Sequence, residues 1–254
     1  MELKGFLYRY SSFTLAKVTL LIGRSAILIL SYQWLTKAEF ALIASAFSFV
    51  EILRVLTDVG AENIIYSRLS SVNKAIPYIV KSLVTFRMQV SFLVSAIFSF
   101  TSYFIFSSDI WPLFLLPAIN SLQSSNFGFM QKNRDFRKIF ALLILVFLAA
   151  LLSVYAVFLY ESKGIILIFL MILPELCASV IGLVITKSTW YNIMLYKPRV
   201  THLLPKLLPY MLPSFAVSIL VVLYTRLDVI LVLPLLGTLS QANYSIGFRL
   251  VEPL

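Results

Sequence analysis

The chain has 254 residues, of which 60% are hydrophobic and 13% are charged, and its mean hydropathy of +0.94 lies far outside the range of soluble globular domains. We therefore expect an integral membrane protein, built as an all-α polytopic bundle of transmembrane helices. The formal net charge of +10 does not indicate nucleic acid, because no basic face exists outside short loops. It favours an anionic lipid surface or an anionic substrate as partner.

Apolar segments long enough to cross a bilayer, which takes about 20 residues, recur along the chain. The sequence predicts seven complete spans, over residues 12–35, 39–64, 78–106, 110–130, 139–160, 164–186 and 208–235. An eighth begins near Gln241 and is cut at Leu254. Because a helix cannot stop in mid-bilayer with its carbonyls unsatisfied, we expect the chain to be incomplete there. We divide it into a six-helix transmembrane half, residues 1–200, and the beginning of a second half, residues 201–254.

Positive charge alternates between the loops. Lys and Arg gather in the N-terminal tail and in the second, fourth and sixth connections, whereas the first and fifth hold Lys37 and Lys163 and the seventh holds no charge. By the positive-inside rule, the N-terminus and the even-numbered connections then face the cytoplasm. We therefore expect a multi-pass protein of the cytoplasmic (inner) membrane with a cytoplasmic N-terminus.

The outward connections are too short to fold as domains. The sequence contains no Gly-rich phosphate loop, metal-ligand spacing or nucleophile elbow. A membrane glycosyltransferase or polymerase is expected to display carboxylates on a sizeable external loop, and the outward loops here offer Glu39, Asp109 and Glu161. We therefore predict no catalytic residues, no metal and no cofactor, and expect that the protein is not an enzyme.

Ionisable residues nevertheless lie inside the predicted spans, where a charge at the helix centre costs roughly 2.5 to 3.5 kcal/mol. They are Lys17, Arg24, Glu51, Arg54, Asp58, Glu62, Arg87, Glu175, Arg226, Asp228 and Arg249. A set of this size cannot all face lipid. We expect these side chains to face one another or a polar cavity.

The charges of the first three spans leave two interpretations open. Glu51, Arg54 and Asp58 follow at spacings of three and four residues and so share one helical stripe. The stripe is either a set of ion pairs, Arg54 with Glu51 or Asp58, that fixes helix packing, or part of a transport cavity. Arg24 lies near mid-bilayer, where it cannot easily snorkel, and is a cavity candidate. Arg87 either snorkels towards the cytoplasm or faces the cavity.

Two polar features mark the fourth and sixth spans. Asn120, Gln123 and Asn126 follow at three-residue steps, and we favour hydrogen bonds between helices over contact with a sugar as their use. Glu175 directly follows Pro174 at an expected kink. It is either a proton or ion site or a paired structural acid.

The seventh span begins with prolines and carries a charged pair. Pro205, Pro209 and Pro213 predict either a bent or broken first segment or a proline-capped helix start. Arg226 and Asp228 lie two residues apart and point about 200° apart on a regular helix. We expect each to find its own partner, on a different neighbour or in the cavity.

Four stretches carry a resemblance, residues 28–70, 130–143, 208–232 and 237–252. Asp58 and Gly60 end the second span as Asp-x-Gly, and Arg226 and Asp228 form an Arg-x-Asp pair. In these features the chain resembles the polysaccharide transporter family, the flippases for O-antigen and other lipid-linked repeat units within the multidrug/oligosaccharidyl-lipid/polysaccharide exporter superfamily. Members have two pseudo-symmetric halves around a central cavity. The resemblance implies that this chain holds one six-helix half, with the second half truncated.

The resemblance further implies translocation of polyprenyl-pyrophosphate-linked oligosaccharide by alternating access, for O-antigen, capsule or exopolysaccharide, with polysaccharide polymerase and assembly proteins as further partners. A doubly anionic pyrophosphate needs cations in a low-dielectric cavity. The expected substrate-binding cations are Arg24, Arg54, Arg87 and Arg226, and the expected pairing or ion-coupling acids are Glu51, Asp58, Glu175 and Asp228. Two alternatives stay open: a multidrug-type exporter, which should have an acidic cavity, and a truncated fragment without transport activity of its own.

Overall fold

The computed structural model describes residues 25–61, 76–104, 109–132, 136–160, 164–195 and 200–251. The elements in these ranges are α2 (Lys37–Asp58), α4 (Ile76–Phe104), the 3-10 helix η1 (Trp111–Leu115), α5 (Leu116–Lys132), α6 (Phe136–Tyr160), α7 (Gly164–Ile185), α8 (Lys187–Leu195) and α9 (Val200–Val251). Residues 25–31 are also helical. The expectation of an all-α bundle is confirmed over the described part of the chain.

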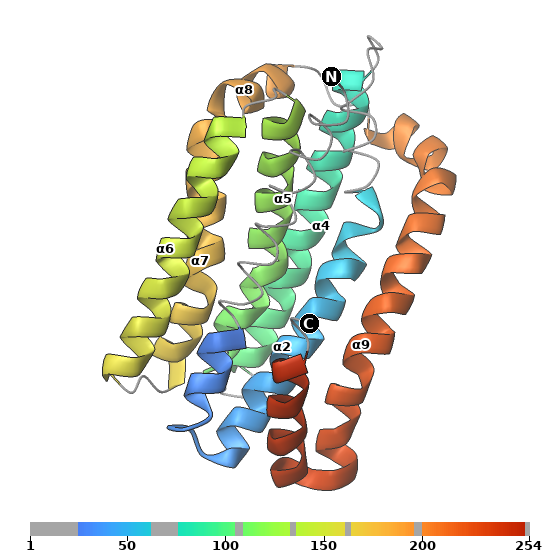
Figure 1. Cartoon of the computed structure of the whole chain (residues 1–254). Coiled ribbons are helices and arrows are strands. Elements are labelled where there is room, and N and C mark those ends of the chain that lie inside the picture. The colour runs from blue at the N-terminus through green and yellow to red at the C-terminus, as the bar shows by residue number, and fades with distance from the viewer. Residues whose placement is uncertain are drawn as a thin grey trace.

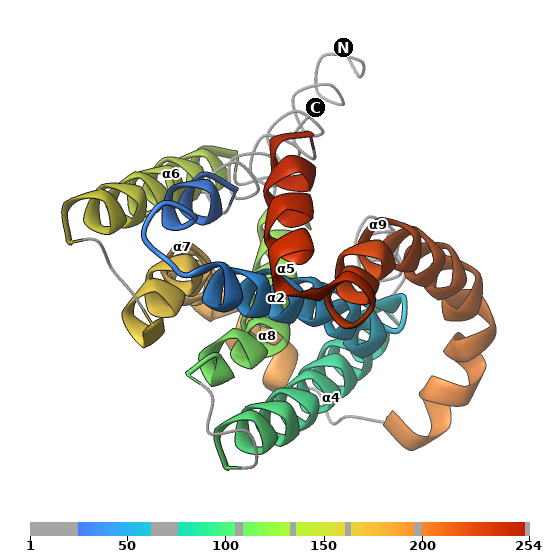
Figure 2. The ribbon, with the colours of Figure 1, turned by 90° about the horizontal axis from the view of Figure 1, so that it is seen from below.

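The long helices run side by side as a bundle, with α6 and α7 on one side, α9 on the other, and α2, α4 and α5 between them (Figure 1). Seen along the bundle, α2 lies at its centre (Figure 2), and it packs most extensively on α9 and also on α5 and α4. We name the two ends of the bundle after the glycines at which the chain turns there: the Gly60 end, where α2 stops, and the Gly237 end, where α9 turns back.

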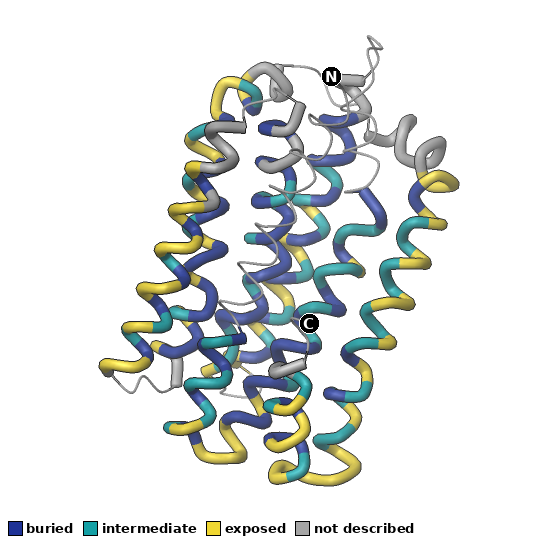
Figure 3. Tube along the Cα trace, in the orientation of Figure 1, coloured by how far each residue is buried: buried dark blue, intermediate teal, exposed yellow. Residues whose placement is uncertain are grey.

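The helices are apolar enough to cross a membrane. Among the described residues, four segments have the necessary length and hydropathy, Lys37–Asp58, Val80–Phe104, Ile166–Ile185 and Leu208–Phe248. Exposed residues follow the outer sides of α6 and α9 (Figure 3), and many of them are large and apolar, such as Leu152 and Leu235. Such surfaces suit contact with lipid rather than with water.

The predicted count of seven complete spans is not confirmed. The second, third, sixth and seventh spans match the four segments above, and α6 supplies a shorter apolar helix, Ile144–Leu159. The fourth begins differently from the expectation, as the 3-10 helix η1 with Pro112 in its first turn, followed by the 17-residue helix α5. Most of the first span lies outside the described residues.

Local signals fix both ends of α2. At its start, the Thr36 hydroxyl accepts a hydrogen bond from the backbone N–H of Glu39, and the Glu39 carboxylate accepts one from the backbone N–H of Thr36, which forms a capping box. At its end, Val59 and Gly60 both have positive φ, 49° and 74°. A Cβ on Gly60 would lie 2.6 Å from the carbonyl oxygen of Met211. Only glycine therefore lets α2 end so close to the backbone of α9.

Helix α9 contains two helices joined at Gly237, whose φ of 81° and ψ of 177° break the helical path. The turn lies between the predicted end of the seventh span at residue 235 and the predicted start of the eighth near Gln241. Residues 238–251, which we name the return segment, run back beside the first part of α9 (Figure 1). The helix stays unbroken through Pro205, Pro209 and Pro213 and curves along its first part (Figure 2). The first part of α9 is therefore bent, as one interpretation predicted, but it is not broken.

Candidate functional site

The charged candidates of α2 and α4 meet at the Gly60 end of the bundle. The Arg87 guanidinium Nε lies 2.7 Å from the Asp58 carboxylate Oδ1, and the two side chains are 4% and 17% exposed. Arg87 therefore does not snorkel towards a surface, as one interpretation allowed, but faces the interior and joins α4 to α2. Asp58 is the last residue of α2 and directly precedes Val59 and Gly60, where the helix ends.

The rest of the charged stripe on α2 pairs within its own helix. The Arg54 Nη1 atom lies 3.4 Å from the Glu51 Oε2 atom, one turn away, and the side chains are 31% and 15% exposed. This is one of the two local pairings expected from the sequence, whereas Asp58 reaches across to α4. An ion pair this exposed contributes little to stability, typically about 0.2 to 1 kcal/mol. The stripe thus divides into a local pair and an interhelical pair.

Arg226 and Asp228 on α9 both contact the return segment. Arg226 is 8% exposed, and its guanidinium carbon lies 5.5 Å from the centre of the Phe248 ring, a cation–π contact. Asp228 accepts a hydrogen bond from the Tyr244 hydroxyl and another, of 2.7 Å, from the backbone N–H of Val229. The Tyr244 and Phe248 rings stack on each other. Each charge thus has a partner of its own, as expected, and these two partners lie on the same segment because the turn at Gly237 brings it against both charges.

The return segment is also tied to the start of α2. The Tyr32 hydroxyl donates to the Asn243 side-chain oxygen at 2.9 Å, and the Gln241 amide donates to the Ser45 hydroxyl at 3.0 Å. These hydrogen bonds hold the return segment on α2 while its rings contact Arg226 and Asp228. The residues 242–244, which carry part of the sequence resemblance, therefore lie at the junction of α2 and α9.

Glu175 is buried, with 1% of its surface exposed, and follows Pro174 inside α7. This helix packs chiefly on α6 and α5. Glu175 therefore lies on a different helix from the Asp58–Arg87 pair and from Arg226. Whether it carries an ion or pairs as a structural acid stays a prediction. Arg24, the remaining substrate-binding candidate, lies outside the described residues.

Sequence reasoning missed Lys81 on α4. Its side chain is 6% exposed, and it lies six residues before Arg87, so α4 buries two cations near the Gly60 end. The signal was available, because Lys81 lies three residues inside the third predicted span. Lysine near the end of a span usually snorkels, which makes a buried one easy to overlook.

The polar face of α5 serves helix packing, as we favoured. Asn126 is 1% exposed and donates to the Ser179 carbonyl at 3.0 Å. Its side-chain oxygen accepts from the Thr186 hydroxyl at 3.0 Å and from the Trp190 indole at 2.7 Å. We name these four residues the Asn126 cluster. The interhelical interpretation is confirmed for Asn126, which links α5 to α7 and α8.

Among the described residues, no group of three or more His, Cys, Asp or Glu side chains is placed to hold a metal ion. Besides the local Glu51–Arg54 pair, the described helices bring charged groups together in two further sets. One is the Asp58–Arg87 pair with Lys81 nearby on α4, and the other is Arg226 and Asp228 against the return segment.

Comparison with known families identifies one that fits this arrangement. A family model described as "Polysaccharide biosynthesis protein" matches residues 33–254. The chain belongs to this family. The match begins just before α2 and runs through α9, so this polysaccharide biosynthesis protein carries Asp58, Arg87 and Arg226 inside the matched region and Arg24 outside it. Curated proteins and solved structures give no significant match.

Proposed function

We propose that this polysaccharide biosynthesis protein is a flippase, which moves polyprenyl-pyrophosphate-linked oligosaccharide repeat units across the cytoplasmic membrane by alternating access. The units belong to O-antigen, capsule or exopolysaccharide. One observation carries the proposal: Arg87 and Arg226, 3% and 8% exposed, are buried in helices long enough to span a membrane and stand on the two helices beside α2. Family membership indicates a role in polysaccharide biosynthesis, and the buried cations indicate that the substrate carries negative charge.

The chemistry of pyrophosphate explains why buried arginines suit this role. An anion loses its hydration when it crosses hydrocarbon, and a guanidinium can replace part of it with a planar fork of N–H donors. The attraction is strong in a low-dielectric interior. The Phe248 ring orients the Arg226 guanidinium without neutralising its charge. Arg24 and Arg54 belong to the same proposed set of cations.

The Asp58–Arg87 pair gives the proposal a switching element. An anionic headgroup can exchange with the Asp58 carboxylate as the partner of Arg87, and the exchange releases the link between α2 and α4. Breaking such a pair without replacement is costly, by about 3 to 5 kcal/mol, so the release is favoured only when substrate is present. Glu51, Glu175 and Asp228 are the proposed further acids that pair with cations or carry a coupling ion.

A transporter of this kind is not an enzyme. We place the Gly237 end outside the cell and the N-terminus in the cytoplasm, on the loop charges. Residues 1–200 form the first half of the transporter and residues 201–254 open the second. Polysaccharide polymerase and assembly proteins are the proposed partners on the outer side. A multidrug-type exporter fits less well, because the described interior buries Lys81 as well as the two arginines.

The test replaces the cations in cells that express the protein from its native gene. Arg24→Ala and Arg226→Ala should each lower surface polysaccharide at least tenfold at normal protein level, because the pyrophosphate loses a counter-charge in the membrane interior. Lys187→Ala, which removes an exposed cation at the start of α8, is the matched control and should have no effect. Surface polysaccharide at the wild-type level in both arginine variants would remove the cationic-cavity hypothesis.

A further inference from the structure

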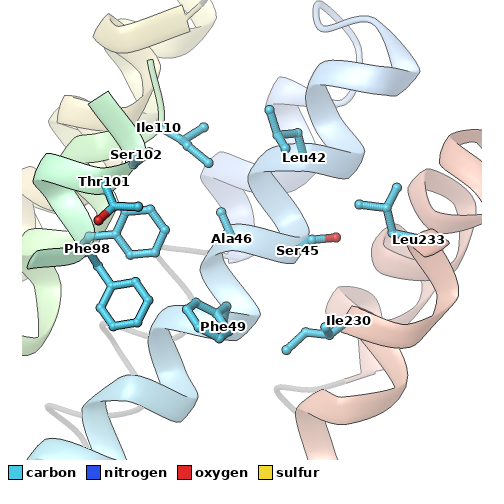
Figure 4. Close-up of a pocket in the computed structure, with 11 residues that line it drawn as sticks. Leu42, Ser45, Ala46, Phe49, Phe98, Thr101, Ser102, Ile110, Ile230 and Leu233 are labelled. Atoms are coloured by element: carbon cyan, nitrogen blue, oxygen red, sulfur yellow. The ribbon is translucent and has the colours of Figure 1, made fainter. Parts of the chain in front are cut away.

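An apolar cavity of about 780 Å³ lies towards the Gly237 end of the bundle. As Figure 4 shows, α2 lies between two walls, with Phe98 and Ile110 on one side and Ile230 and Leu233 of α9 on the other. Its volume lies within the range of about 300 to 1,000 Å³ that is typical of ligand sites. Leu42 on its rim is 46% exposed, so the cavity is open to its surroundings.

The lining selects an apolar ligand without charge. Its residues are Leu42, Ser45, Ala46, Phe49, Phe98, Thr101, Ser102, Ile110, Phe114, Ile230 and Leu233. None of these is ionisable, and the Ser45 hydroxyl already accepts a hydrogen bond from Gln241. Phe49, Phe98 and Phe114 contact one another through their rings and form the aromatic side of the cavity. A hydrocarbon chain gains from such a surface, whereas a sugar or a phosphate loses its hydration there.

A cation lies on the same face of α9 as the two residues of that helix that line the cavity. Arg226, Ile230 and Leu233 follow at spacings of four and three residues, so they share one face of the helix. Arg226 therefore lies one helical turn from Ile230, about 6 Å further from the Gly237 end. A ligand with an apolar chain and an anionic head satisfies both features at once.

The depth of Arg226 in the membrane indicates whether that ligand is a phospholipid of the bilayer or a transported lipid. It lies eleven residues before Gly237, which is about 16 Å along a helix and thus about half of a hydrocarbon core of ~30 Å. A phospholipid of the bilayer keeps its headgroup at the membrane surface. A lipid whose headgroup is carried through the bilayer puts its anion at the depth of Arg226.

We propose that this cavity is the site for the isoprenoid chain of the lipid-linked substrate, held between α2, α4 and α9 while the pyrophosphate contacts Arg226. The inference rests on the proposed flippase function and adds a lipid-chain subsite to it. The chain excludes water from the cavity during transport, and the cavity sets how much of the chain next to the pyrophosphate travels inside the protein rather than in the bilayer.

The test uses photolabelling of the purified 254-residue chain in nanodiscs of phosphatidylethanolamine and phosphatidylglycerol. The probe is an isoprenoid pyrophosphate with a diazirine on its chain, and mass spectrometry locates the labelled peptides. We expect label on the cavity-lining parts of α2 and α9. Ala46→Trp on α2 and Leu233→Trp on α9, which fill the cavity from two different helices, should each reduce this labelling at least fivefold. Leu235→Trp, two residues along α9 and 73% exposed, is the matched control and should label like the wild type.

Two results would overturn the subsite. One is undiminished labelling of the lining in both Ala46→Trp and Leu233→Trp. The other is equal labelling by a diazirine phosphatidylglycerol, which would assign the cavity to bilayer lipid. Transport of a fluorescent lipid-linked oligosaccharide by the same protein in liposomes separates this test from the proposed function. If the wild-type protein transports the lipid and both Trp variants are labelled like the wild type, the subsite is refuted and the flippase proposal stands. If the cavity is labelled but the protein does not transport the lipid, the flippase proposal is refuted and the cavity remains a lipid-binding site.

Discussion

The Asn126 cluster and the Asp58–Arg87 pair both bury polar groups between helices, but they do so with different chemistry. Asn126 uses neutral hydrogen bonds to Ser179, Thr186 and Trp190, and the bonds join α5 to α7 and α8. The pair uses two full charges across α2 and α4. Neutral bonds satisfy each other and leave nothing that an anion would displace. A charged pair can instead exchange one carboxylate for another anion, so it suits a part that moves.

The largest effect on stability is expected from removing one partner of the Asp58–Arg87 pair. Asp58→Ala leaves Arg87, 3% exposed, without its carboxylate in the interior. Removal of one partner from a buried pair should lower the free energy of unfolding by about 3 to 5 kcal/mol. Denaturant unfolding of the purified protein in detergent, followed by tryptophan fluorescence, measures the loss.

Glu51→Ala is the control for Asp58→Ala, because it breaks the more exposed pair on the same helix. The expected loss is at most about 1 kcal/mol. Equal losses in the two variants would show that the interhelical pair has no special role in joining α2 to α4.

The difference between the two regions also shows what sequence alone can predict. Hydropathy and span length predict an all-α membrane bundle, and three-residue spacing predicts the packing role of Asn126. Helical spacing on α2, in contrast, offers Arg54 either Glu51 or Asp58 as partner. The structure pairs Arg54 with Glu51, and it pairs Asp58 with Arg87 of α4, which no spacing within α2 indicates. Which helix faces the end of α2 is decided by tertiary packing, including the close contact of Gly60 with α9. No single-helix pattern contains that information.

The same limit applies to α9. The turn at Gly237 is predictable from its sequence, but the alignment of the two helices across it is not. That alignment places Tyr244 on Asp228 and Phe248 on Arg226, and it gives both charges a contact on one neighbour. Lys81 was missed for a related reason, since burial of a lysine near a span end depends on the helices packed around it.

Asn126→Ala tests the Asn126 cluster. The change removes three hydrogen bonds and leaves the buried Trp190 indole without its acceptor. We expect a loss of about 2 to 3 kcal/mol in the free energy of unfolding, measured as above. Transport per folded molecule should stay at the wild-type level, because the cluster serves packing.

Ser125→Ala is the control for this change, because its hydroxyl donates within α5 to the Ser121 carbonyl at 2.8 Å. It should lower the free energy of unfolding by at most about 1 kcal/mol. A transport defect in Asn126→Ala at equal folded protein would contradict the division of the two regions into a packing part and a moving part.

The smallest effect is expected from Tyr244→Phe, which sharpens the comparison within α9. The substitution removes the hydroxyl that donates to Asp228 and keeps the ring stacked near Phe248. Because Asp228 keeps the hydrogen bond from the backbone N–H of Val229, the free energy of unfolding should fall by only about 1 kcal/mol. Tyr224→Phe, at a position 88% exposed on the same helix, should change nothing measurable. If Asp228 holds the return segment in place, Tyr244→Phe also speeds amide hydrogen exchange in residues 238–251. Unchanged exchange there would mean that three other contacts are sufficient to hold the segment. They are the hydrogen bonds from Tyr32 to Asn243 and from Gln241 to Ser45, and the contact of Phe248 with Arg226.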